Sequence, residues 1–401
     1  MIEAPSADTA ARPAIRFQKG RSRRFRAGHP WAFSNEIEMT PEAKALPPGS
    51  LVTLVDAGDE KLGVATFNPH SLIAARVLSR NAADVIDAAF LAGRLKRALT
   101  LRETLYADPC YRLVHSEADG LPGLIVDRYG DVVTLQANTA GMERLTPLLI
   151  EALVEALGTR TVVLRNDSPV RGLEGLDTHH RVALGELSGP VELVENGVRF
   201  VADLTEGQKT GWFYDQRDNR AFMARLARGR RVLDVYTYAG GFAVTAAMAG
   251  AAEVTAVDRS EHSLGLAARA AELNGVPLKV ARAEAFAEMA RLDAAGERFG
   301  VVIADPPAFV KSKKDLHAGA KGYRKMARLA AALVEPGGFL LCASCSHHMP
   351  ADLFAEEIAH GLGQAGRSGR IIRSAGAAPD HPVHPLLPES AYLKAVALQL
   401  D

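Results

Sequence analysis

Cysteine is scarce in this chain, with 3 residues in 401. So few thiols exclude a disulfide framework. The one Cys-x-x-Cys spacing, from Cys342 to Cys345, has no second pair with which to build a structural zinc site, so no metal is expected. Excess charge is also missing, because 47 Lys and Arg residues balance 47 Asp and Glu residues. Hydrophobic residues make up 48%, which excludes a disordered chain, and the length predicts about two to three domains.

Long apolar runs are missing too. The longest relevant uncharged stretch, Val235 to Ala252, has 18 residues and only reaches the lower limit for a membrane span. It contains Gly240, Gly241, two threonines and two tyrosines, so a strand, a loop and a helix are predicted there instead. The first 14 residues lack the apolar core of a secretory signal. We therefore expect a cytoplasmic protein that has no membrane partner.

The charge is locally uneven near the N-terminus. Seven basic residues and no acidic one lie between Arg12 and Pro30, with aromatic residues among them and just after them. Basic side chains mixed with aromatic rings suit a surface that follows phosphates and stacks bases. A solvated basic strand above a small core is the simpler alternative. With strands predicted at Leu51–Val55 and Leu72–Leu78, residues 12–82 are interpreted as a small β-rich RNA-binding domain. The residues expected to contact RNA are Arg21, Arg23, Arg24 and Arg26.

Two further domains are predicted from the pattern of helices and strands. Residues 83–190 indicate a central α+β domain, with helices over Ala83–Tyr106 and Glu143–Leu157 and a hairpin that turns at Tyr129-Gly130. Residues 191–401 alternate strands with helices, which is typical of an α/β fold with a doubly wound, mostly parallel sheet. Its strands are expected at Arg231–Val235, Glu253–Val257, Phe299–Ala304 and Phe339–Ala343, and its helices at Phe242–Ala249, Glu261–Leu273 and Tyr323–Leu333.

The ends of the first two strands of this sheet indicate a nucleoside site. Asp234 is followed by a loop that contains Gly240 and Gly241, and Asp258 ends the next strand. Glycines let the backbone approach a ligand closely, and a carboxylate at the second strand end can accept hydrogen bonds from a ribose diol. The full dinucleotide fingerprint is absent, so a nucleoside without pyrophosphate is favoured, and S-adenosylmethionine fits. A capped turn with an exposed Asp258 is the alternative.

A rigid loop, Asp305-Pro306-Pro307-Ala308-Phe309, follows the next apolar strand. Its prolines restrict the backbone, so it can hold Asp305 and the Pro306 carbonyl against a planar base. A stiff turn capped by Asp305 is the alternative. The basic residues that follow could hold substrate phosphates or only solvate the loop. They are Lys311, Lys313 and Lys314.

Cys345 is predicted to lie just past a strand end, on the ligand-binding edge, whereas Cys342 falls within that strand and Cys110 has no partner pattern. Cytosine C5 is too electron-poor to attack a methyl sulfonium unaided. A thiolate that adds to C6 makes C5 nucleophilic, and it leaves once a base has removed the C5 proton. Cys345 is thus a candidate nucleophile, and a structural thiol is the alternative. Cys110 and Cys342 are expected to be structural.

Together these motifs resemble the RlmI-type class I S-adenosylmethionine-dependent methyltransferases, which form 5-methylcytosine in 23S ribosomal RNA. The resemblance covers nearly the whole chain and includes an N-terminal PUA domain. The motifs on which it depends are Gly28–Phe33, Tyr111–Asp127, Glu206–Gly211, Asp215–Asn219, Asp234–Phe242, Asp305–Phe309, Ser344–Ser346 and Asp380–Pro382.

The resemblance implies a class I methyltransferase domain with a seven-stranded sheet at residues 191–401, S-adenosylmethionine as cofactor, Cys345 as nucleophile and Asp305 as the group that polarises cytosine. Glu284 stands where relatives often carry Asp. Related cytosine methyltransferases often have another Cys after the prolines of this loop, but Pro307-Ala308-Phe309 has none, as in RlmI-type proteins. The expected cofactor-binding residues are Gln216, Asp234, Tyr236, Tyr238, Gly240, Gly241, Asp258, Glu284, Ala285, Asp305 and Pro306.

The resemblance also implies ribosomal RNA as partner, with 23S RNA expected, and makes a homodimer plausible. The target base must leave its stack to reach Cys345. Two alternatives stay open. Asp-Pro-Pro-aromatic loops also serve methylation of exocyclic amines, which needs no cysteine. An RNA-binding assembly factor with a vestigial cofactor site would not bind S-adenosylmethionine.

Overall fold

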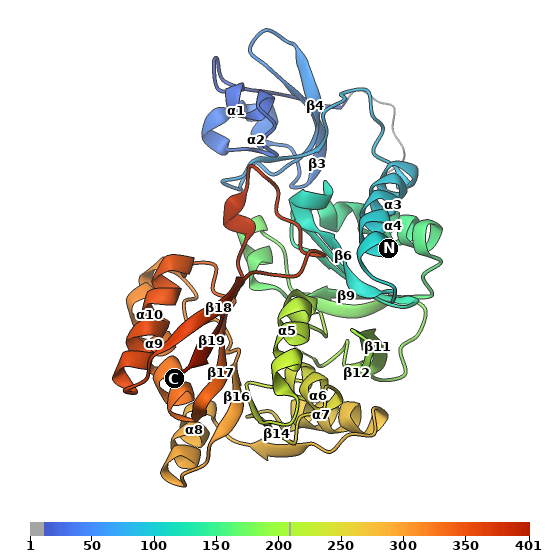
Figure 1. Cartoon of the computed structure of the whole chain (residues 1–401). Coiled ribbons are helices and arrows are strands. Elements are labelled where there is room, and N and C mark those ends of the chain that lie inside the picture. Colours follow the sequence, from blue (N-terminus) through green and yellow to red (C-terminus); the bar gives the residue numbers. More distant parts are fainter. Residues whose placement is uncertain (1–11, 208–209) are drawn as a thin grey trace. The chain divides into compact units, whose positions relative to one another are not determined.

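The computed structural model describes residues 12–207 and 210–401 (Figure 1). Gln208 and Lys209 of the Glu206–Gly211 motif, and most of the first 14 residues, lie outside this description. The chain forms two compact units, which are described separately. Unit 1 comprises the described parts of Met1–Gly189, Leu204–Trp212 and Asp380–Pro388, and unit 2 comprises Pro190–Asp203, Phe213–Pro379 and Glu389–Asp401. No helix in the described part of the chain has the length and apolar character needed to cross a membrane.

Unit 1 begins with a five-stranded sheet in the order β1-β3-β4-β5-β2. The strands are β1 (Ala14–Arg16), β2 (Trp31–Ala32), β3 (Ser50–Val55), β4 (Lys61–Phe67) and β5 (Ala75–Ser79), accompanied by short helices α1 (Arg23–Arg26) and α2 (Pro41–Lys44). Phe17, Phe25 and Phe67 are buried in its core. The β-rich module is confirmed, but part of the basic run forms helix α1, and β5 begins at Ala75 rather than at Leu72.

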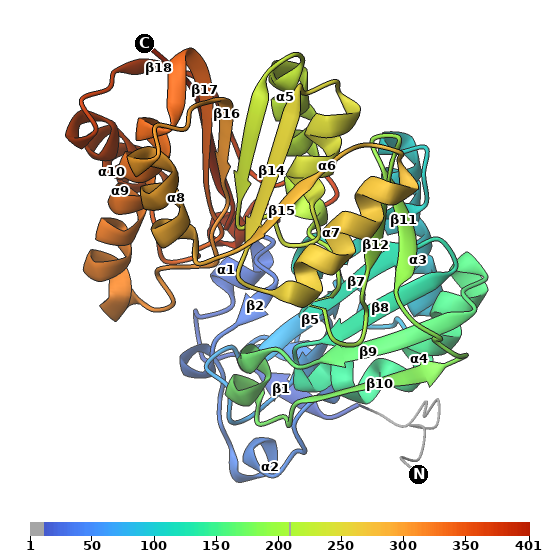
Figure 2. The same ribbon diagram turned by 90° about the horizontal axis from the view of Figure 1, so that it is seen from below.

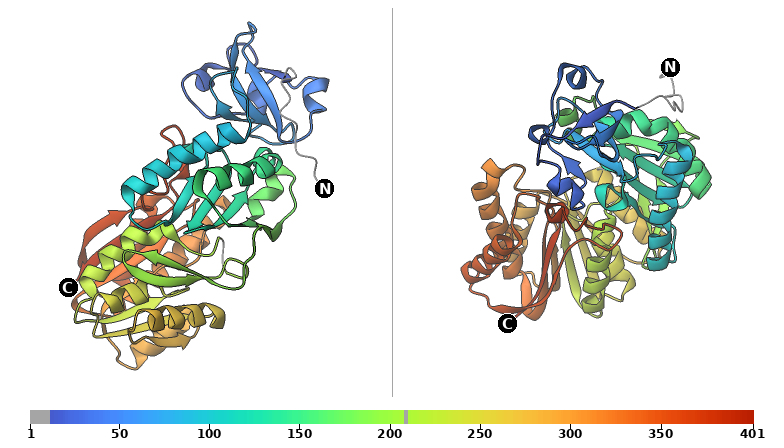
Figure 3. Two further views of the ribbon diagram at one scale, coloured as in Figure 1. Left: turned by 90° about the vertical axis from the view of Figure 1, so that its right-hand side faces the viewer. Right: turned by 90° about the horizontal axis from the view of Figure 1, so that it is seen from above.

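A second five-stranded sheet in unit 1 has the order β10-β9-β8-β7-β6. Helices α3 and α4 pack on it and lie side by side (Figure 3). The elements are α3 (Ala88–Leu105), β6 (Cys110–His115), β7 (Leu124–Tyr129), β8 (Val132–Ala137), α4 (Ala140–Leu157), β9 (Thr161–Asn166) and β10 (His179–Leu184). The predicted start of α3 at Ala83 is wrong, because the Asp87 carboxylate accepts a hydrogen bond from the backbone N–H of Phe90 (2.8 Å) and caps the helix five residues later.

Unit 2 contains a seven-stranded sheet in the order β15-β14-β13-β16-β17-β19-β18, in which β19 is antiparallel to both of its neighbours. The strands are β13 (Arg231–Val235), β14 (Glu253–Asp258), β15 (Lys279–Arg282), β16 (Phe299–Ala304), β17 (Val334–Ser344), β18 (Gly369–Ala375) and β19 (Lys394–Leu400). The helices are α5 (Arg217–Ala227), α6 (Gly241–Met248), α7 (Glu261–Leu273), α8 (Ala285–Ala294), α9 (Leu316–Ala332) and α10 (Ala351–Gln364). This topology confirms the doubly wound, mostly parallel α/β sheet.

Both faces of the seven-stranded sheet are covered, which explains its continuous apolar strands. Along β16, Val301 and Ile303 pack with α5 and α6, whereas Val302 and Ala304 pack with α8, α9 and α10. Figure 2 shows these two sets of helices on opposite sides of the sheet. Helix α9 begins at Leu316, seven residues before the predicted Tyr323.

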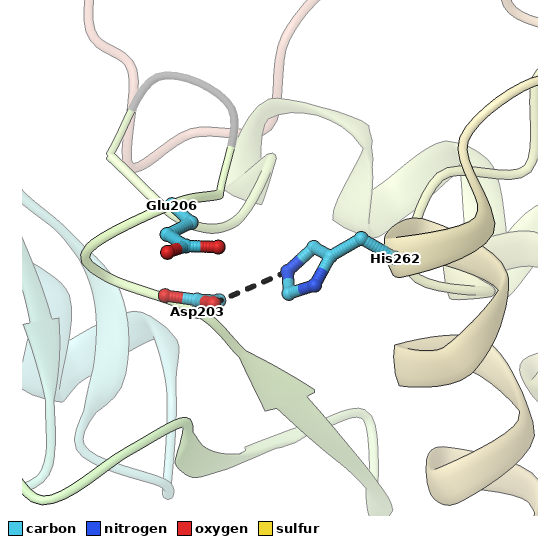
Figure 4. A group of neighbouring side chains, drawn as sticks. All are labelled: Asp203, Glu206 and His262. Carbon is cyan, nitrogen blue, oxygen red and sulfur yellow. Dashed lines mark ion pairs between the residues drawn. The ribbon is translucent and has the colours of Figure 1, made fainter.

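A separate hairpin of unit 2, β11 (Val191–Glu195) and β12 (Val198–Ala202), packs against α7. Asn274, just after α7, accepts a hydrogen bond from the Arg199 backbone N–H (3.0 Å) and donates one to the Arg199 carbonyl (2.6 Å). Near the start of α7, Nε2 of His262 lies 3.1 Å from Oδ2 of Asp203 (Figure 4). The hairpin is thereby attached to α7 near both ends of the helix.

Candidate active site

The carboxyl edge of the seven-stranded sheet carries four of the predicted site residues. β13, β14, β16 and β17 run parallel, so their carboxyl ends share one edge. Asp234 lies in β13, Asp258 ends β14, Asp305 follows β16 and Cys345 follows β17. β13 lies between β14 and β16, where the strand order reverses, and doubly wound sheets bind ligands at such a switch point. The placement at strand ends is confirmed, and the roles of these residues stay predictions.

The loop after β13 has an unusual backbone. Tyr236 and Tyr238 have φ values of +66° and +50°, which are rare for residues with bulky side chains, and Gly240 has φ +80°. A Cβ added to Gly240 would lie 2.8 Å from Cβ of Ala267, so α7 approaches too closely for any side chain there. The backbone N–H of Tyr238 donates to Oδ2 of Asp258 (3.0 Å) and helps to hold the loop. Strained backbone that its surroundings hold in place is concentrated at functional sites.

Asp234 is a buried carboxylate with one oxygen to spare. Its Oδ2 accepts hydrogen bonds from Thr237 Oγ1 (2.6 Å) and from the backbone N–H of Ala243 (3.0 Å). Its Oδ1 has no hydrogen-bond partner within the described part of the chain. Burial raises the pKa of Asp234 to about 7, and the charge of Asp305 also raises it, while the two hydrogen bonds oppose the rise. A cationic ligand group at Oδ1 would satisfy this oxygen and stabilise its charge.

Asp258 is held by the backbone at both of its oxygens. Besides the bond from Tyr238, Oδ1 accepts from the backbone N–H of Ser260 (2.9 Å). A carboxylate has about four lone-pair positions, so this orientation leaves acceptor capacity for the two hydroxyls of a ribose. The two backbone hydrogen bonds form the capped turn that was the alternative interpretation of Asp258. The remaining acceptor capacity of the carboxylate is also compatible with ribose binding.

Glu284 has a structural role as well as its predicted one. It is the N-cap of α8, where its Oε2 accepts from the backbone N–H of Ala287 (2.9 Å). The side chain is exposed, and the next residue, Ala285, is buried. The cap engages one carboxylate oxygen, so any contact with an adenine amine would use the other.

Gln216 is buried just before α5, and its Oε1 accepts from Nδ2 of Asn219 (2.7 Å). Its Nε2 has no hydrogen-bond partner among the described residues, so it offers a buried donor. Four residues further on, Arg220 pairs with the buried carboxylate of Glu195 (2.6 Å). A Cβ on Gly241 would lie 2.5 Å from Nε of Arg220. Helix α5 is therefore packed directly against the start of α6, where the predicted cofactor loop ends.

The Asp305 loop leaves β16 with Asp305 half-buried, Pro306 buried and Pro307 exposed. Neither proline has an N–H, so the loop makes few backbone hydrogen bonds of its own. The Phe309 ring centroid lies 4.8 Å from that of Tyr323, whose hydroxyl accepts from the Phe309 backbone N–H (3.4 Å). A side chain of α9 therefore supports the far end of this loop.

Tyr323 also joins this loop to the cysteine segment. Its hydroxyl accepts from Ser344 Oγ (2.8 Å) and hydrogen-bonds with Ser346 Oγ (2.7 Å), which in turn accepts from the backbone N–H of Val310 (3.1 Å). Both serines are fully buried, and burial raises the pKa of Tyr323, which keeps its hydroxyl protonated. Cys345 stands between the two serines, so this network determines where its backbone lies relative to the Asp305 loop.

Of the three cysteines, only Cys345 is partly exposed. Cys342 is completely buried, and burial raises its pKa to about 12, so it stays a thiol at neutral pH. Cys110 is buried in β6. The structure agrees with the assignment of Cys342 and Cys110 as structural, and it leaves Cys345 as the accessible thiol.

A cation lies close to Cys345. Lys394, the first residue of β19, pairs in register with Ser344, and its Nζ donates to the carbonyls of Ser346 (2.6 Å) and Tyr392 (2.7 Å). Burial lowers the pKa of Lys394, while charge on Cys345 acts in the opposite direction. A positive charge at this position favours the thiolate of a neighbouring cysteine.

The basic run of unit 1 is partly neutralised by acidic residues that the sequence places far from it. Arg24 forms an ion pair with Glu36 (3.0 Å), and Arg26 forms ion pairs with Asp56 and Glu60 (both 2.6 Å). The local excess of charge is therefore smaller than the run of seven basic residues indicated.

The remaining predicted RNA contacts carry exposed charge. Arg21 and Arg23 in unit 1, and Lys311, Lys313 and Lys314 in unit 2, are exposed. Across residues 12–207 and 210–401, no ion pair engages any of these five side chains. They are available to a polyanion, and their contact with RNA stays a prediction.

Sequence reasoning missed three side chains that position the site: Tyr323, Lys394 and Arg220. Tyr323 was assigned only to the start of a helix. Lys394 is 49 residues from Cys345 along the chain, and only the antiparallel pairing of β19 with β17 brings them together. The sequence feature that could have identified Arg220 is its position directly after the Asp215–Asn219 motif, in the first turn of α5.

Comparison with known proteins identifies the class to which this fold and site belong. A family model described as S-adenosylmethionine-dependent methyltransferase matches residues 135–394, and a model of a PUA-like domain matches residues 15–80. A protein described as a SAM-dependent methyltransferase, from Streptococcus mutans, has a similar fold, with a TM-score of 0.78 and 19% identity over 96% of this chain and all of that chain. Another methyltransferase structure, complexed with SAH, has a TM-score of 0.80 and 20% identity over 97% of this chain and all of that one.

Curated relatives define the family more narrowly. Proteins named ribosomal RNA large subunit methyltransferase I are 38% identical in Erwinia tasmaniensis, over 95% of this chain and 98% of the relative, and 37% identical in Klebsiella pneumoniae, over 97% and 98%. A relative of the same name from Escherichia coli is 36% identical over 95% of this chain and 98% of its own. The chain therefore belongs to this family of S-adenosylmethionine-dependent methyltransferases, and the family resemblance stated from the sequence is confirmed.

Proposed function

We propose that this methyltransferase modifies C5 of a cytosine in ribosomal RNA of the large subunit, 23S RNA, through a covalent adduct with Cys345. The observation that carries the proposal is the placement of Cys345. It is the accessible cysteine, it follows β17 at the ligand-binding edge, and the buried Tyr323 network attaches its segment to the Asp305 loop. Relatives named for ribosomal RNA of the large subunit supply the substrate class.

The residues at the strand ends fit S-adenosylmethionine. The unsatisfied Oδ1 of Asp234 suits a cationic group, Asp258 suits a ribose diol, and the close approach of α7 at Gly240 keeps the loop free of a side chain. When bound, the cofactor supplies an electrophilic methyl group on its sulfonium. We assign its binding to the residues predicted above, from Gln216 to Pro306.

The chain's own residues carry out the steps on cytosine. The Cys345 thiolate forms a bond to C6, and the electron pair of the C5–C6 double bond moves toward C5. C5 then bonds to the methyl carbon, as the bond between that carbon and the sulfonium sulfur breaks and its electron pair stays on sulfur. Asp305 hydrogen-bonds the base and polarises it for the addition. A base removes the C5 proton, the C5–C6 double bond re-forms, and the thiolate leaves. Lys394 stabilises the thiolate at the beginning and at the end of this cycle.

The test uses large-subunit ribosomal RNA in which cytidine is replaced by 5-fluorocytidine, because fluorine at C5 blocks the elimination step. With S-adenosylmethionine, the wild-type chain should form a denaturation-resistant adduct that peptide mass spectrometry maps to Cys345. Methyl transfer to ordinary RNA without any adduct would favour methylation of an exocyclic amine instead. Absence of both, together with absence of cofactor binding, would favour the RNA-binding assembly factor.

We further propose that the domains cover residues 12–82, 83–190 and 191–401, that the first of them binds RNA, and that the protein acts in the cytoplasm.

A homodimer is a prediction of the family resemblance alone. Sedimentation equilibrium of the purified chain tests it, and a mass near 42.8 kDa would contradict it.

A further inference from the structure

Unit 1 contains a cavity of about 410 Å³ that none of the predicted site residues lines. It lies among the end of β5, helix α3, the turn before β7 and the segment after Asp380. Three of its lining side chains are arginines: Arg80, Arg94 and Arg97. Pockets that bind small ligands or single nucleotides have volumes of about 300–1,000 Å³, so the cavity is large enough for one nucleotide.

The acidic side chains that line this cavity are already neutralised by other groups. Glu117 accepts hydrogen bonds from Nε1 of Trp31 (2.8 Å) and from Arg76 (3.1 Å). Asp119 accepts two from the buried guanidinium of Arg102 (2.6 and 2.9 Å). Neither acid forms an ion pair with an arginine of the cavity.

The three arginines have no carboxylate partner within the described part of unit 1. Arg80 donates to the carbonyls of Phe25 and His29 (both 2.7 Å), and Arg94 donates to the carbonyl of Leu78 (2.6 Å). The side chain of Arg97 is exposed and forms no hydrogen bond or ion pair with another described residue. The cavity therefore carries three arginine side chains that form no ion pair with an acidic side chain among the described residues.

Two further observations on Arg94 are compatible with a bound anion. Nε of Arg94 is buried and has no hydrogen-bond partner among the described residues. Burial lowers the pKa of Arg94, and the neighbouring charge of Arg97 lowers it further, with Asp84 opposing. A bound anion would relieve this repulsion and satisfy the buried N–H.

The cavity adjoins the segment after α1, because Gly28 and Pro30 are among its lining residues. The guanidinium of Arg80 lies 4.0 Å from the ring centroid of Phe25, a residue of α1 between Arg24 and Arg26. Several guanidinium groups that line one cavity suit the oxygens of a phosphate, because each can donate more than one N–H.

We propose that this arginine-lined cavity of unit 1 binds a phosphate of the RNA substrate. Arg94 and Arg97 would contact the phosphate oxygens, and Arg80 would link the site to α1. The inference rests on the proposed function for the identity of the RNA. A free phosphate compound has the same chemistry and is distinguished below.

The test measures binding of the full-length chain to in vitro transcribed large-subunit ribosomal RNA by fluorescence anisotropy between 50 and 300 mM NaCl. Arg97→Gln removes one exposed charge without disturbing a packed group. Arg97→Lys keeps the charge, and Lys96→Gln is the matched control, because Lys96 is exposed on the same helix but pairs with Glu155 and does not line the cavity. Arg94→Gln is a second variant, accompanied by thermal unfolding to show that the protein stays folded.

We expect Arg97→Gln to weaken binding about three- to tenfold and to reduce the slope of log affinity against log salt by about 1. Lys96→Gln and Arg97→Lys should keep nearly the wild-type slope. Equal slopes for Arg97→Gln and Lys96→Gln would overturn the proposal. So would calorimetric binding of AMP or inorganic phosphate that Arg97→Gln abolishes while the RNA slope is unchanged, since the ligand would then be a free phosphate compound.

The proposed function fails separately from this inference. Methyl transfer by the wild-type chain to the same RNA tests the function, and the salt slope of Arg97→Gln tests the cavity. A reduced slope without any methyl transfer would support the cavity and contradict the function. Methyl transfer by the wild-type chain, together with an unchanged salt slope for Arg97→Gln, would support the function and contradict the cavity.

Discussion

Two ionisable side chains lie at the carboxyl edge of the sheet: Asp234, which is buried, and Lys394, which is half-buried. Burial raises the pKa of Asp234 to about 7 and lowers the pKa of Lys394. In both cases burial disfavours the charged form, and a ligand or neighbour of opposite charge restores it. Perturbed groups of this kind are concentrated in functional sites. Each leads to a prediction that is independent of the other.

Binding of S-adenosylmethionine should depend on pH through Asp234. A cation at Oδ1 favours the carboxylate, so the pKa of Asp234 falls on binding and a proton is released between the two pKa values. Affinity should rise from pH 5.5 to 7 by up to about tenfold per pH unit and level off above pH 8. Calorimetry at pH 6 in two buffers of different ionisation enthalpy measures the released proton. Equal affinity at pH 6 and pH 8 would show that Asp234 does not face the cofactor.

Replacing Lys394 should make Cys345 less reactive at neutral pH. Lys394→Met removes the neighbouring cation, so the midpoint of Cys345 alkylation by iodoacetamide should move to higher pH by about one unit. Lys394→Arg keeps the charge and should move it less. The rate is followed by peptide mass spectrometry across pH 6–10, with the pH profile of methyl transfer alongside. An unchanged midpoint in Lys394→Met would mean that Lys394 only supports the backbone.

At the scale of elements, the central feature is the joint between the Asp305 loop and the end of β17. These segments are about 40 residues apart in sequence and come from neighbouring parallel strands. Parallel pairing alone places strand ends side by side. The hydroxyls of Tyr323, Ser344 and Ser346 then determine the separation of the loops. A displacement of about 1 Å between reacting groups can cost about a hundredfold in rate.

Tyr323→Phe should therefore lower kcat by about 10- to 100-fold while leaving the affinity for S-adenosylmethionine nearly unchanged. The two buried serines lose their shared partner, which should cost about 1–3 kcal/mol in the free energy of unfolding. Tyr111→Phe is the matched control, since its hydroxyl accepts from Arg128 (2.8 Å) in unit 1. The control should lose stability but keep kcat. Full kcat in Tyr323→Phe would contradict the positioning role.

Prediction from the sequence succeeded best for elements whose local residue pattern is enough to specify a strand. β13, β14 and β16 are buried on both faces, so they appear as short apolar runs that end in Asp or directly before it. β19 was not predicted, although Val396, Leu398 and Leu400 alternate as in a strand, and its place beside β17 follows only from the antiparallel pairing. The early start predicted for α3 failed because Val85 extends the three- and four-residue spacing of apolar residues ahead of the helix, which begins only after the Asp87 cap.

The candidate site was partly predictable for the same reason. Asp234, Asp258, Asp305 and Cys345 follow recognisable strands, so topology alone brings them to one edge. The groups that position them come from elements far away in sequence. Tyr323 and Lys394 contact the cysteine segment only after α9 and β19 have packed. Ion pairing of Arg24 and Arg26 likewise depends on tertiary structure.

At the scale of the whole molecule, net charge is zero, so attraction to RNA must come from local patches. Arg21 and Arg23, like Lys19, are exposed residues of the basic run that form no ion pair with a described acid. Arg21→Gln with Arg23→Gln should weaken RNA binding and lower its salt slope by about 1.5 to 2. Anisotropy titrations against salt measure this, and the double variant Lys44→Gln with Lys61→Gln removes two exposed charges from the same unit. An equal effect of both double variants would mean that the basic run has no special role.

The covalent bond between Cys345 and cytosine is the central claim, and trapping on 5-fluorocytidine-substituted large-subunit RNA tests it most directly. Wild-type protein should yield an adduct at Cys345 that depends on S-adenosylmethionine for its stability to denaturation. Cys345→Ala should yield none and lose at least about a thousandfold in methyl transfer, while Cys342→Ala should keep both if it folds. Full turnover by Cys345→Ala, or an adduct at any other residue, would contradict the mechanism.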